Sequence, residues 1–142
     1  MELSNLTEKI IGCAYKVYNI LGFGFLESVY ENALAIELKK TGFKIEKKPI
    51  KVFYEGEVVG NFKADIIVND LIIVELKSVA SIIKEFEVQL VNYLTATIKP
   101  VGLLLNFGPK KVEIKRKVRI LPKKNNPVNL CYPVILSKNI VI

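Results

Sequence analysis

The chain has 142 residues, of which 51% are hydrophobic, and it carries a formal net charge of +7. This length suffices for one domain with its own core, so we predict a single domain over residues 1–142. The chain has no histidine. That absence excludes His-based catalytic triads, histidine general bases and His-ligated zinc sites.

The cysteines and the N-terminus predict a cytoplasmic protein. Cys13 and Cys131 are far apart in sequence and form no metal-ligand pair, which is typical of a reduced protein. The first five residues lack the basic flank and apolar core of a signal peptide. No apolar run approaches the ~20 residues that span a bilayer, so no membrane association is expected. The positive charge permits a polyanionic partner.

Helical periodicity predicts a first helix near the N-terminus. Asn5 and Glu8 resemble a capping pair, and apolar residues then recur at helical spacing from Leu6 to Leu21. The glycines at 22 and 24 should end this helix.

A second helix is expected from residue 24 or 25 to residue 41. Glu27 would lie in its first turn, where the helix dipole favours a carboxylate, and Tyr30 would share its face. Taken alone, Glu27 is explained well enough as a surface residue that complements the dipole.

Strands are predicted next, at residues 43–47 and 50–54, followed by a hairpin turn at residues 55–57. The chain should then continue into two strongly apolar runs at 63–68 and 71–77, separated by a turn at Asn69-Asp70. These runs contain three charges: Asp65, Glu75 and Lys77. Burying a charge is costly unless it is paired or binds a metal, so these three residues mark a candidate site.

The register of these two runs decides whether the charges meet. A two-residue turn would place Asp65 opposite Val74 and leave Glu75 on the other face. A three-residue turn, Asn69 to Leu71, would place Asp65 opposite Glu75. We predict the second arrangement, or a bulge with the same result. Facing carboxylates repel unless a cation lies between them, and oxygen ligands suit Mg²⁺ or Mn²⁺.

A third helix is predicted to start at residues 78–81 and to end before Pro100. Gln89 and Tyr93 are one turn apart and share a face, and a purely structural role, with Tyr93 in the core and Gln89 at its edge, explains the pair alone. Residues 101–107 form a short apolar run suited to a buried strand. The element order predicts one α/β or α+β domain with a mixed sheet.

Residues 110–124 carry eight basic residues and one acidic residue. Apolar and mostly basic side chains alternate there, which predicts a strand with one basic face. Two interpretations are equally supported. The lysines protect a solvated edge strand, or they contact phosphates through Lys115, Lys117 and Arg119. The apolar extension at 132–142 could add a strand, cover the core or pair with another chain.

The ordered motifs resemble a known family. Residues Gly24–Tyr30 fit the G-x-x-E-x-x-Y signature of the GxxExxY family, part of the PD-(D/E)XK nuclease superfamily. Asp65 matches the first acidic position of the nuclease pattern, and Glu75–Lys77 match the E-x-K element. Gln89 and Tyr93 resemble the Q-x-x-x-Y motif of the exonuclease-like branch. The resemblance covers about residues 6–107, and it implies a mixed sheet flanked by helices.

The resemblance also implies roles for these residues. Asp65 and Glu75 would hold Mg²⁺, or Mn²⁺ in its place, with the carbonyl of Leu76 as a further ligand and Glu27 arriving from the second helix. Lys77 would position the attacking water or stabilise the transition state. Gln89 and Tyr93 would support the site or contact the nucleic acid. Apart from these carried-over roles, the candidates for site support or nucleic-acid contact include Tyr30 on the second helix and Lys115, Lys117 and Arg119 on the basic strand.

One position departs from the superfamily pattern. Ala64 precedes Asp65, where the superfamily's name has a proline. Phosphodiester hydrolysis needs a metal, carboxylates and a lysine, so the lack of histidine is no obstacle.

Three hypotheses follow. The first is a metal-dependent nuclease, with DNA favoured as the substrate. The second is a non-catalytic nucleic-acid-binding module on a nuclease fold. In the third, Lys77 simply neutralises Glu75 within the sheet. No base-reading motif is visible, so recognition of the backbone or of nucleic-acid structure is expected. A homodimer is a further expectation, because two cuts need two sites.

Overall fold

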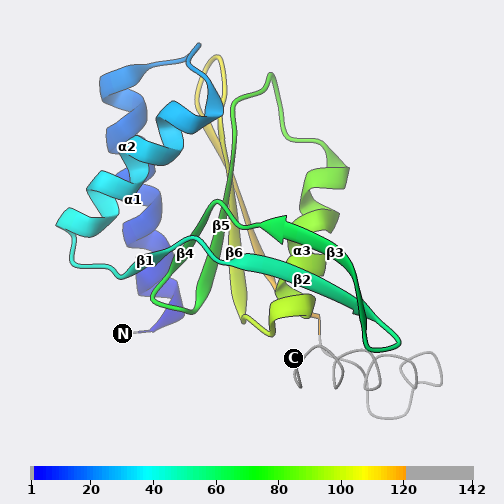
Figure 1. Cartoon of the computed structure of the whole chain (residues 1–142). Coiled ribbons are helices and arrows are strands. Elements are labelled where there is room, and N and C mark those ends of the chain that lie inside the picture. Colours follow the sequence, from blue (N-terminus) through cyan, green and yellow to red (C-terminus); the bar gives the residue numbers. More distant parts are fainter. Residues whose placement is uncertain (1, 121–142) are drawn as a thin grey trace.

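A computed structural model describes residues 2–120 of the chain (Figure 1). Helices and strands follow one another in the order α1 (Leu3–Leu21), α2 (Glu27–Lys40), β1 (Ile45–Glu46), β2 (Pro49–Tyr54), β3 (Glu57–Lys63), β4 (Ile66–Val68), β5 (Ile72–Lys77), α3 (Lys84–Thr97), β6 (Val101–Phe107) and β7 (Val112–Val118). None of the helices in this part of the chain combines the length and apolar character that crossing a membrane requires.

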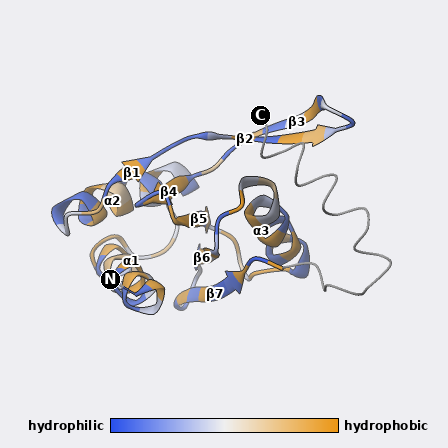
Figure 2. Ribbon diagram, turned by 90° about the horizontal axis from the view of Figure 1, so that it is seen from below, coloured by the Kyte–Doolittle hydropathy of each residue, from blue (hydrophilic) through white to orange (hydrophobic). Residues whose placement is uncertain are grey.

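The central sheet has five strands in the order β1-β4-β5-β6-β7, with β5 and β6 parallel and the other neighbours antiparallel. Strands β2 and β3 form a separate hairpin that packs against α3 (Figure 1). Helices α1 and α2 lie on one side of the sheet and α3 lies on the other (Figure 2). The predicted mixed sheet flanked by helices is confirmed.

Strand alternation divides the core between the two faces. Ile72, Val74 and Leu76 of β5 pack with α1 and α2, whereas Ile73 packs with residues of α3. Both faces of β5 are therefore buried, as its continuous apolar run predicts. Glu75 shares the parity of Ile73 and so belongs to the α3 face.

The turn between β4 and β5 has three residues, because Val68 pairs with Ile72 and Ile66 pairs with Val74. Continuing that register places Asp65, which directly precedes β4, opposite Glu75. The predicted three-residue turn is confirmed. Its first two residues, Asn69 and Asp70, have φ angles of 52° and 57°. Asn and Asp are the non-glycine residues that tolerate this left-handed region best.

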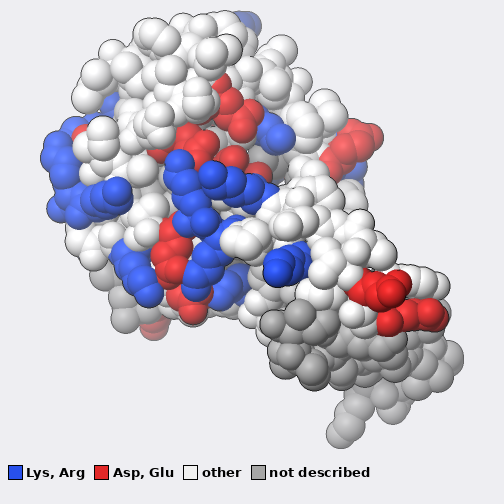
Figure 3. Space-filling view, in the orientation of Figure 1, with Lys and Arg blue, Asp and Glu red and all other residues white. Residues whose placement is uncertain are grey.

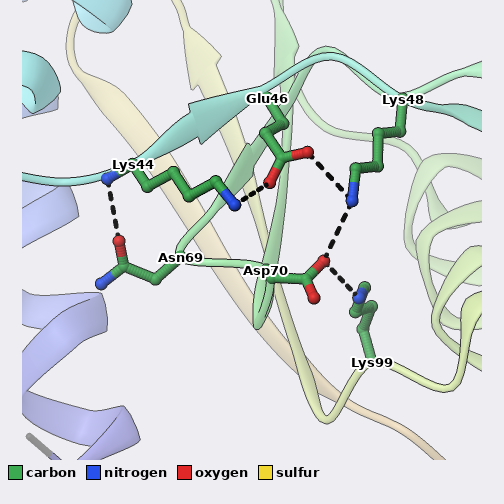
Figure 4. Close-up of polar contacts among 6 residues, drawn as sticks. All are labelled: Lys44, Glu46, Lys48, Asn69, Asp70 and Lys99. Atoms are coloured by element: carbon green, nitrogen blue, oxygen red, sulfur yellow. Dashed lines mark hydrogen bonds and ion pairs between the residues drawn. The ribbon is translucent and has the colours of Figure 1, made fainter.

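A polar network holds this turn in place (Figure 4). The backbone N–H of Lys44 donates to the Asn69 side chain at 2.9 Å, and the Asn69 N–H donates back to the Lys44 carbonyl at 2.9 Å. Asp70 pairs with Lys99 at 2.8 Å and with Lys48 at 3.6 Å. The network ties the turn to the residues that flank β1 and to the loop after α3, so the β4–β5 register is supported from two directions.

The start of the first helix differs from the prediction. Helix α1 begins at Leu3, and its N-cap, Glu2, makes no side-chain capping bond. Asn5 and Glu8 lie inside the helix, so the predicted capping pair is wrong. The helix ends at Leu21 with Gly22 as its C-cap, as expected.

The start of the third helix differs from the prediction as well, because α3 begins at Lys84 and not at residues 78–81. The side chain of Asn106 accepts a hydrogen bond from the Val79 N–H and donates one to the Val79 carbonyl, each at 2.9 Å. These bonds hold residue 79 in a loop, and a helix cannot form until the chain has left that contact.

Two strand predictions need correction, and one is confirmed. The strand expected at 43–47 is reduced to the two residues of β1. The hairpin does not continue into β4, because the chain changes sheets between Lys63 and Ile66. The basic strand is present as β7. The end of the basic stretch, 121–124, and the apolar extension at 132–142 lie outside the described residues.

Gly102 provides a test of how α3 is seated on the sheet. A Cβ atom at this position of β6 would lie 2.8 Å from Cδ1 and 3.0 Å from Cγ of the fully buried Leu90. We expect Gly102→Ala to lower the free energy of unfolding by about 1–3 kcal/mol through overpacking. Chemical denaturation followed by circular dichroism measures this change.

Gly12→Ala is the matched control. Gly12 is exposed within α1, and nothing lies within 4 Å of its Cβ position. Alanine should therefore stabilise the helix by about 0.5–1 kcal/mol. If Gly102→Ala were equally stabilising, the close approach of α3 to β6 would be refuted.

Candidate active site

Asp65 and Glu75 form the centre of the candidate site. The backbone N–H of Asp65 donates to Glu75 Oε1 at 3.3 Å, and the N–H of Leu76 donates to Asp65 Oδ2 at 2.8 Å. Each carboxylate is thus held by the backbone of the neighbouring strand. This reciprocal arrangement fixes both side chains on the α3 face of the sheet.

Burial raises the pKa values of both carboxyl groups. Glu75 is 8% exposed, and desolvation together with the negative charge of Asp65 raises the pKa of Glu75 to about 8. Burial also raises the pKa of Asp65, although the hydrogen bond from Leu76 opposes that shift. Near neutral pH the raised pKa therefore favours the protonated form of Glu75. A cation between the two groups would replace that proton and remove the repulsion.

Lys77 lies beside the pair. Its positive charge lowers the pKa values of both Asp65 and Glu75, against the larger effect of burial. Its Nζ lies 4.5 Å from the centroid of the Phe86 ring on α3. The ion pairs among the described residues include none between Lys77 and a carboxylate. The hypothesis that Lys77 only neutralises Glu75 gains no support from this arrangement.

Glu27 reaches the same site from the first turn of α2. Burial is the main cause that raises its pKa, followed by the negative charge of Asp65, while Lys77 lowers it. These couplings place the Glu27 carboxylate within electrostatic reach of the central pair. The expectation that Glu27 lies in the first turn is confirmed.

The loop before α2 is held by three hydrogen bonds. The Tyr30 hydroxyl donates to the Gly22 carbonyl at 2.5 Å and accepts from the Phe25 N–H at 3.3 Å. The Ser78 hydroxyl donates to the Phe25 carbonyl at 2.9 Å. Because Ser78 directly follows β5, this contact brings the start of α2 to the strand end that carries Lys77.

Tyr30 itself is fully buried and stacks on Phe107, with ring centroids 4.5 Å apart. It therefore cannot contact a nucleic acid. Of the two roles considered for Tyr30, support of the site is the one that its position allows.

Tyr93 and Gln89 approach the pair from α3. Burial raises the pKa of the Tyr93 hydroxyl, as do the negative charges of Glu75 and Asp65, while a hydrogen bond with the Gln89 side chain lowers it. Tyr93 is 8% exposed, whereas Gln89 is exposed. The two residues thus extend the site from the buried carboxylates to the surface.

The three basic residues proposed for phosphate contact differ in their exposure and in their contacts. Lys115 is exposed and lies level with Glu75, because Glu75 pairs with Leu104 and Leu104 with Lys115. Lys117 forms an ion pair with Glu87 at 2.6 Å. Arg119 is partly buried, and its Nε is buried without a partner. Lys115 is therefore the best placed of the three.

Charge on the visible face is mixed. Acidic and basic side chains lie interspersed over its centre, and the basic groups form no continuous field there (Figure 3). Several lysines of the described residues form ion pairs, as Lys44 and Lys48 do with Glu46. The net charge of the chain therefore does not show where a nucleic acid would bind.

Two residues at the site were missed by sequence reasoning. Glu31 raises the pKa of Asp65 and pairs with Lys47 at 2.7 Å. Its position four residues after Glu27 on one helix face was the available signal. Asn106 is fully buried and holds the loop after β5 through Val79. A lone polar residue inside an apolar strand was its signal.

The donor set fits a hard divalent cation. Asp65 and Glu75 offer carboxylate oxygens on adjacent strands, and oxygen ligands suit Mg²⁺ and Mn²⁺. No group of three or more acidic or cysteine side chains within residues 2–120 is already arranged around one metal position. Further ligands would have to come from the backbone, from Glu27 or from a bound phosphate.

A mixed sheet that carries an Asp, then a Glu and Lys two residues apart on the next strand, defines a nuclease-like protein. A family model described as the PD-(D/E)XK nuclease superfamily matches residues 4–117, so the chain belongs to this superfamily. The superfamily typically uses divalent metals. No curated protein and no solved structure matches the chain.

The raised pKa of Glu75 predicts how stability depends on pH in the absence of metal. Its folded-state pKa near 8 exceeds the ordinary glutamate value of 4.5, so the folded state binds an extra proton between those pH values. The free energy of unfolding should therefore fall as the pH rises from about 4.5 to about 8. Glu75→Gln should flatten this dependence and raise the free energy of unfolding near pH 8. Urea unfolding at several pH values measures both effects.

Glu8→Gln is the matched control, because Glu8 is exposed on α1. It should change stability by less than about 0.5 kcal/mol. A wild-type stability that rose between pH 5 and 8, or a destabilised Glu75→Gln protein, would contradict the proposed origin of the shift.

Proposed function

We propose that this protein is a metal-dependent nuclease of the GxxExxY family that hydrolyses phosphodiester bonds, with DNA favoured as its substrate. The observation that carries the proposal is the facing pair of Asp65 and Glu75, each held by the other strand's backbone, with Lys77 beside it. Superfamily membership supports the class of reaction.

Asp65 and Glu75 would hold Mg²⁺ or Mn²⁺, with the Leu76 carbonyl and the Glu27 carboxylate as further ligands. When bound, such a cation lowers the pKa of water and shields the charge of the phosphate. The energetic reason for binding lies in the chain itself. Two buried carboxylates that repel each other gain more from a divalent cation than exposed carboxylates would.

The other side chains would orient the reacting groups. Lys77 would position the attacking water or stabilise the negative charge that develops on the phosphate. Its packing on Phe86 limits the positions that its ammonium group can occupy. Tyr93 and Gln89 would support the carboxylates or contact the strand. Lys115, with Lys117 and Arg119, would contact phosphates further along the strand.

A non-catalytic nucleic-acid-binding module is the second candidate. One observation favours it: within residues 2–120 no three acidic or cysteine side chains are already gathered around one metal position. Such a module would bind nucleic acid equally well with and without a divalent cation.

Substitution of the central residues tests the proposal. Asp65→Asn, Glu75→Gln and Lys77→Met should each reduce cleavage of labelled DNA oligonucleotides in Mn²⁺ by roughly 100-fold or more. Titration calorimetry should show Mn²⁺ binding to the wild type, with loss of binding in Glu75→Gln. Methionine preserves the packing of residue 77 on Phe86, so Lys77→Met should retain the fold.

Lys39→Met and Glu8→Gln serve as controls, because both residues are exposed on helices outside the site. Both variants should cleave like the wild type. Cleavage that persists in Asp65→Asn would reject the proposed mechanism. If the wild type bound DNA but neither cleaved it nor bound Mn²⁺, the non-catalytic module would be the better account.

A further inference from the structure

An apolar groove of about 600 Å³ lies between the β2–β3 hairpin and α3. The hairpin contributes Val52 and Phe62 to its lining, and α3 contributes Val88, Asn92 and Tyr93 among others. Its volume falls within the range of roughly 300–1,000 Å³ that is typical of ligand sites. Phe62 and Val88 are 43% and 49% exposed, so the groove leaves a substantial apolar surface open.

Tyr93 connects the groove with the surroundings of the candidate active site. It lines the groove, and it packs in one buried cluster with Ala64, which directly precedes Asp65, and with Ile73, which shares a strand face with Glu75. On the groove side, the Tyr93 ring lies 5.5 Å from the Phe62 ring, centroid to centroid, at an interplanar angle of 38°. On the other side, the negative charges of Glu75 and Asp65 act on the Tyr93 hydroxyl. Gln89 lines the groove and also hydrogen bonds to Tyr93. A ligand in the groove would thus contact a tyrosine whose hydroxyl is within electrostatic reach of the carboxylate pair.

We propose that this groove binds an unpaired nucleobase of the strand whose phosphate lies at Asp65 and Glu75. This inference rests on the proposed nuclease function and narrows the substrate to nucleic acid with unpaired nucleotides, such as a single strand or a flap. A base that remains stacked in a duplex cannot present its face to a side chain, so the nucleotide must leave the stack.

The lining suits a base in three ways. Phe62, which is 43% exposed, offers an aromatic surface on which any base can stack regardless of its identity, and the mostly buried Tyr93 ring supports it from 5.5 Å away. The exposed amides of Gln89 and Asn92 can hydrogen bond to base edges. Lys84 also lines the groove and supplies a positive charge for the adjoining phosphate, although Glu85 lies there as well. Mostly apolar walls with a few polar groups favour a planar base over a fully charged ligand.

A second apolar surface borders the site on the α2 side. Phe23, Phe25 and Leu26 are 49%, 47% and 77% exposed in the loop that precedes Glu27. The hydrogen bonds from Tyr30 and Ser78 hold this loop in place despite its exposure. Exposed aromatic side chains beside a phosphodiesterase site are suited to unstacked bases, and they agree with the same class of substrate.

Fluorescence anisotropy with the full chain in EDTA tests the groove without cleavage. The probes are a labelled single-stranded DNA of mixed sequence and the same strand in a duplex. The wild type should bind the single strand more tightly than the duplex. Phe62→Leu keeps an apolar side chain but removes the ring, and it should weaken single-strand binding about tenfold. Phe62→Tyr should restore the affinity.

Tyr54→Leu is the matched control, since Tyr54 is an aromatic residue of the same hairpin, is 63% exposed and does not line the groove. It should bind like the wild type. Equal affinities of wild type and Phe62→Leu, with Mn²⁺-dependent cleavage intact, would overturn the groove inference alone. Binding that depends on Phe62 without any cleavage would support the groove and reject catalysis. No binding of either probe would overturn the groove inference, and only the lack of cleavage in Mn²⁺ as well would overturn the proposed function.

Two other occupants of the groove would give different results. If a second copy of this chain fills it, Phe62→Leu should change the sedimentation coefficient and leave the affinity for DNA unchanged. If another part of the same chain fills it, the variant should lower the melting temperature with the affinity again unchanged. Either result would overturn the inference.

Discussion

The pairing register of β4 and β5 is the constraint on which the candidate site depends. A slip of one residue would set Asp65 opposite Val74 and turn Glu75 away from it. The three-residue turn prevents this slip, because Asn69 and Asp70 adopt left-handed conformations and are bonded to the residues that flank β1 and to the loop after α3. The contacts of Asn69 and Asp70 with neighbouring segments thus help to keep Asp65 and Glu75 opposite each other.

The same register brings two carboxyl groups into an electrostatically unfavourable arrangement. Two carboxyl groups face one another where desolvation raises both of their pKa values. Apolar contacts on both faces of β5 stabilise the strand enough to tolerate this repulsion. Local destabilisation of this kind is common at functional sites, where activity requires an arrangement that stability alone would not favour. The buried pair, more than the overall positive charge, distinguishes this site from the rest of the surface.

The predicted starts of the first and third helices were wrong. The expected capping pair at Asn5 and Glu8 lies inside α1, since helical propensity extends the helix to Leu3. The helix expected from residues 78–81 is delayed to Lys84, because Asn106 binds the backbone at Val79. Neither outcome is visible in a short window of sequence, and the second depends on a residue 27 positions away.

The sequence by itself determined the order of the elements, the apolar character of β4 to β6 and, through the turn residues, the pairing of Asp65 with Glu75. These features depend on short-range periodicity and turn chemistry, which a single chain displays directly. Only the tertiary structure decided that Glu27 and Glu31 approach Asp65, that Tyr30 is buried, and that the hairpin and α3 enclose a groove beside Tyr93. Those relations depend on how separate elements pack, and no local pattern specifies that packing.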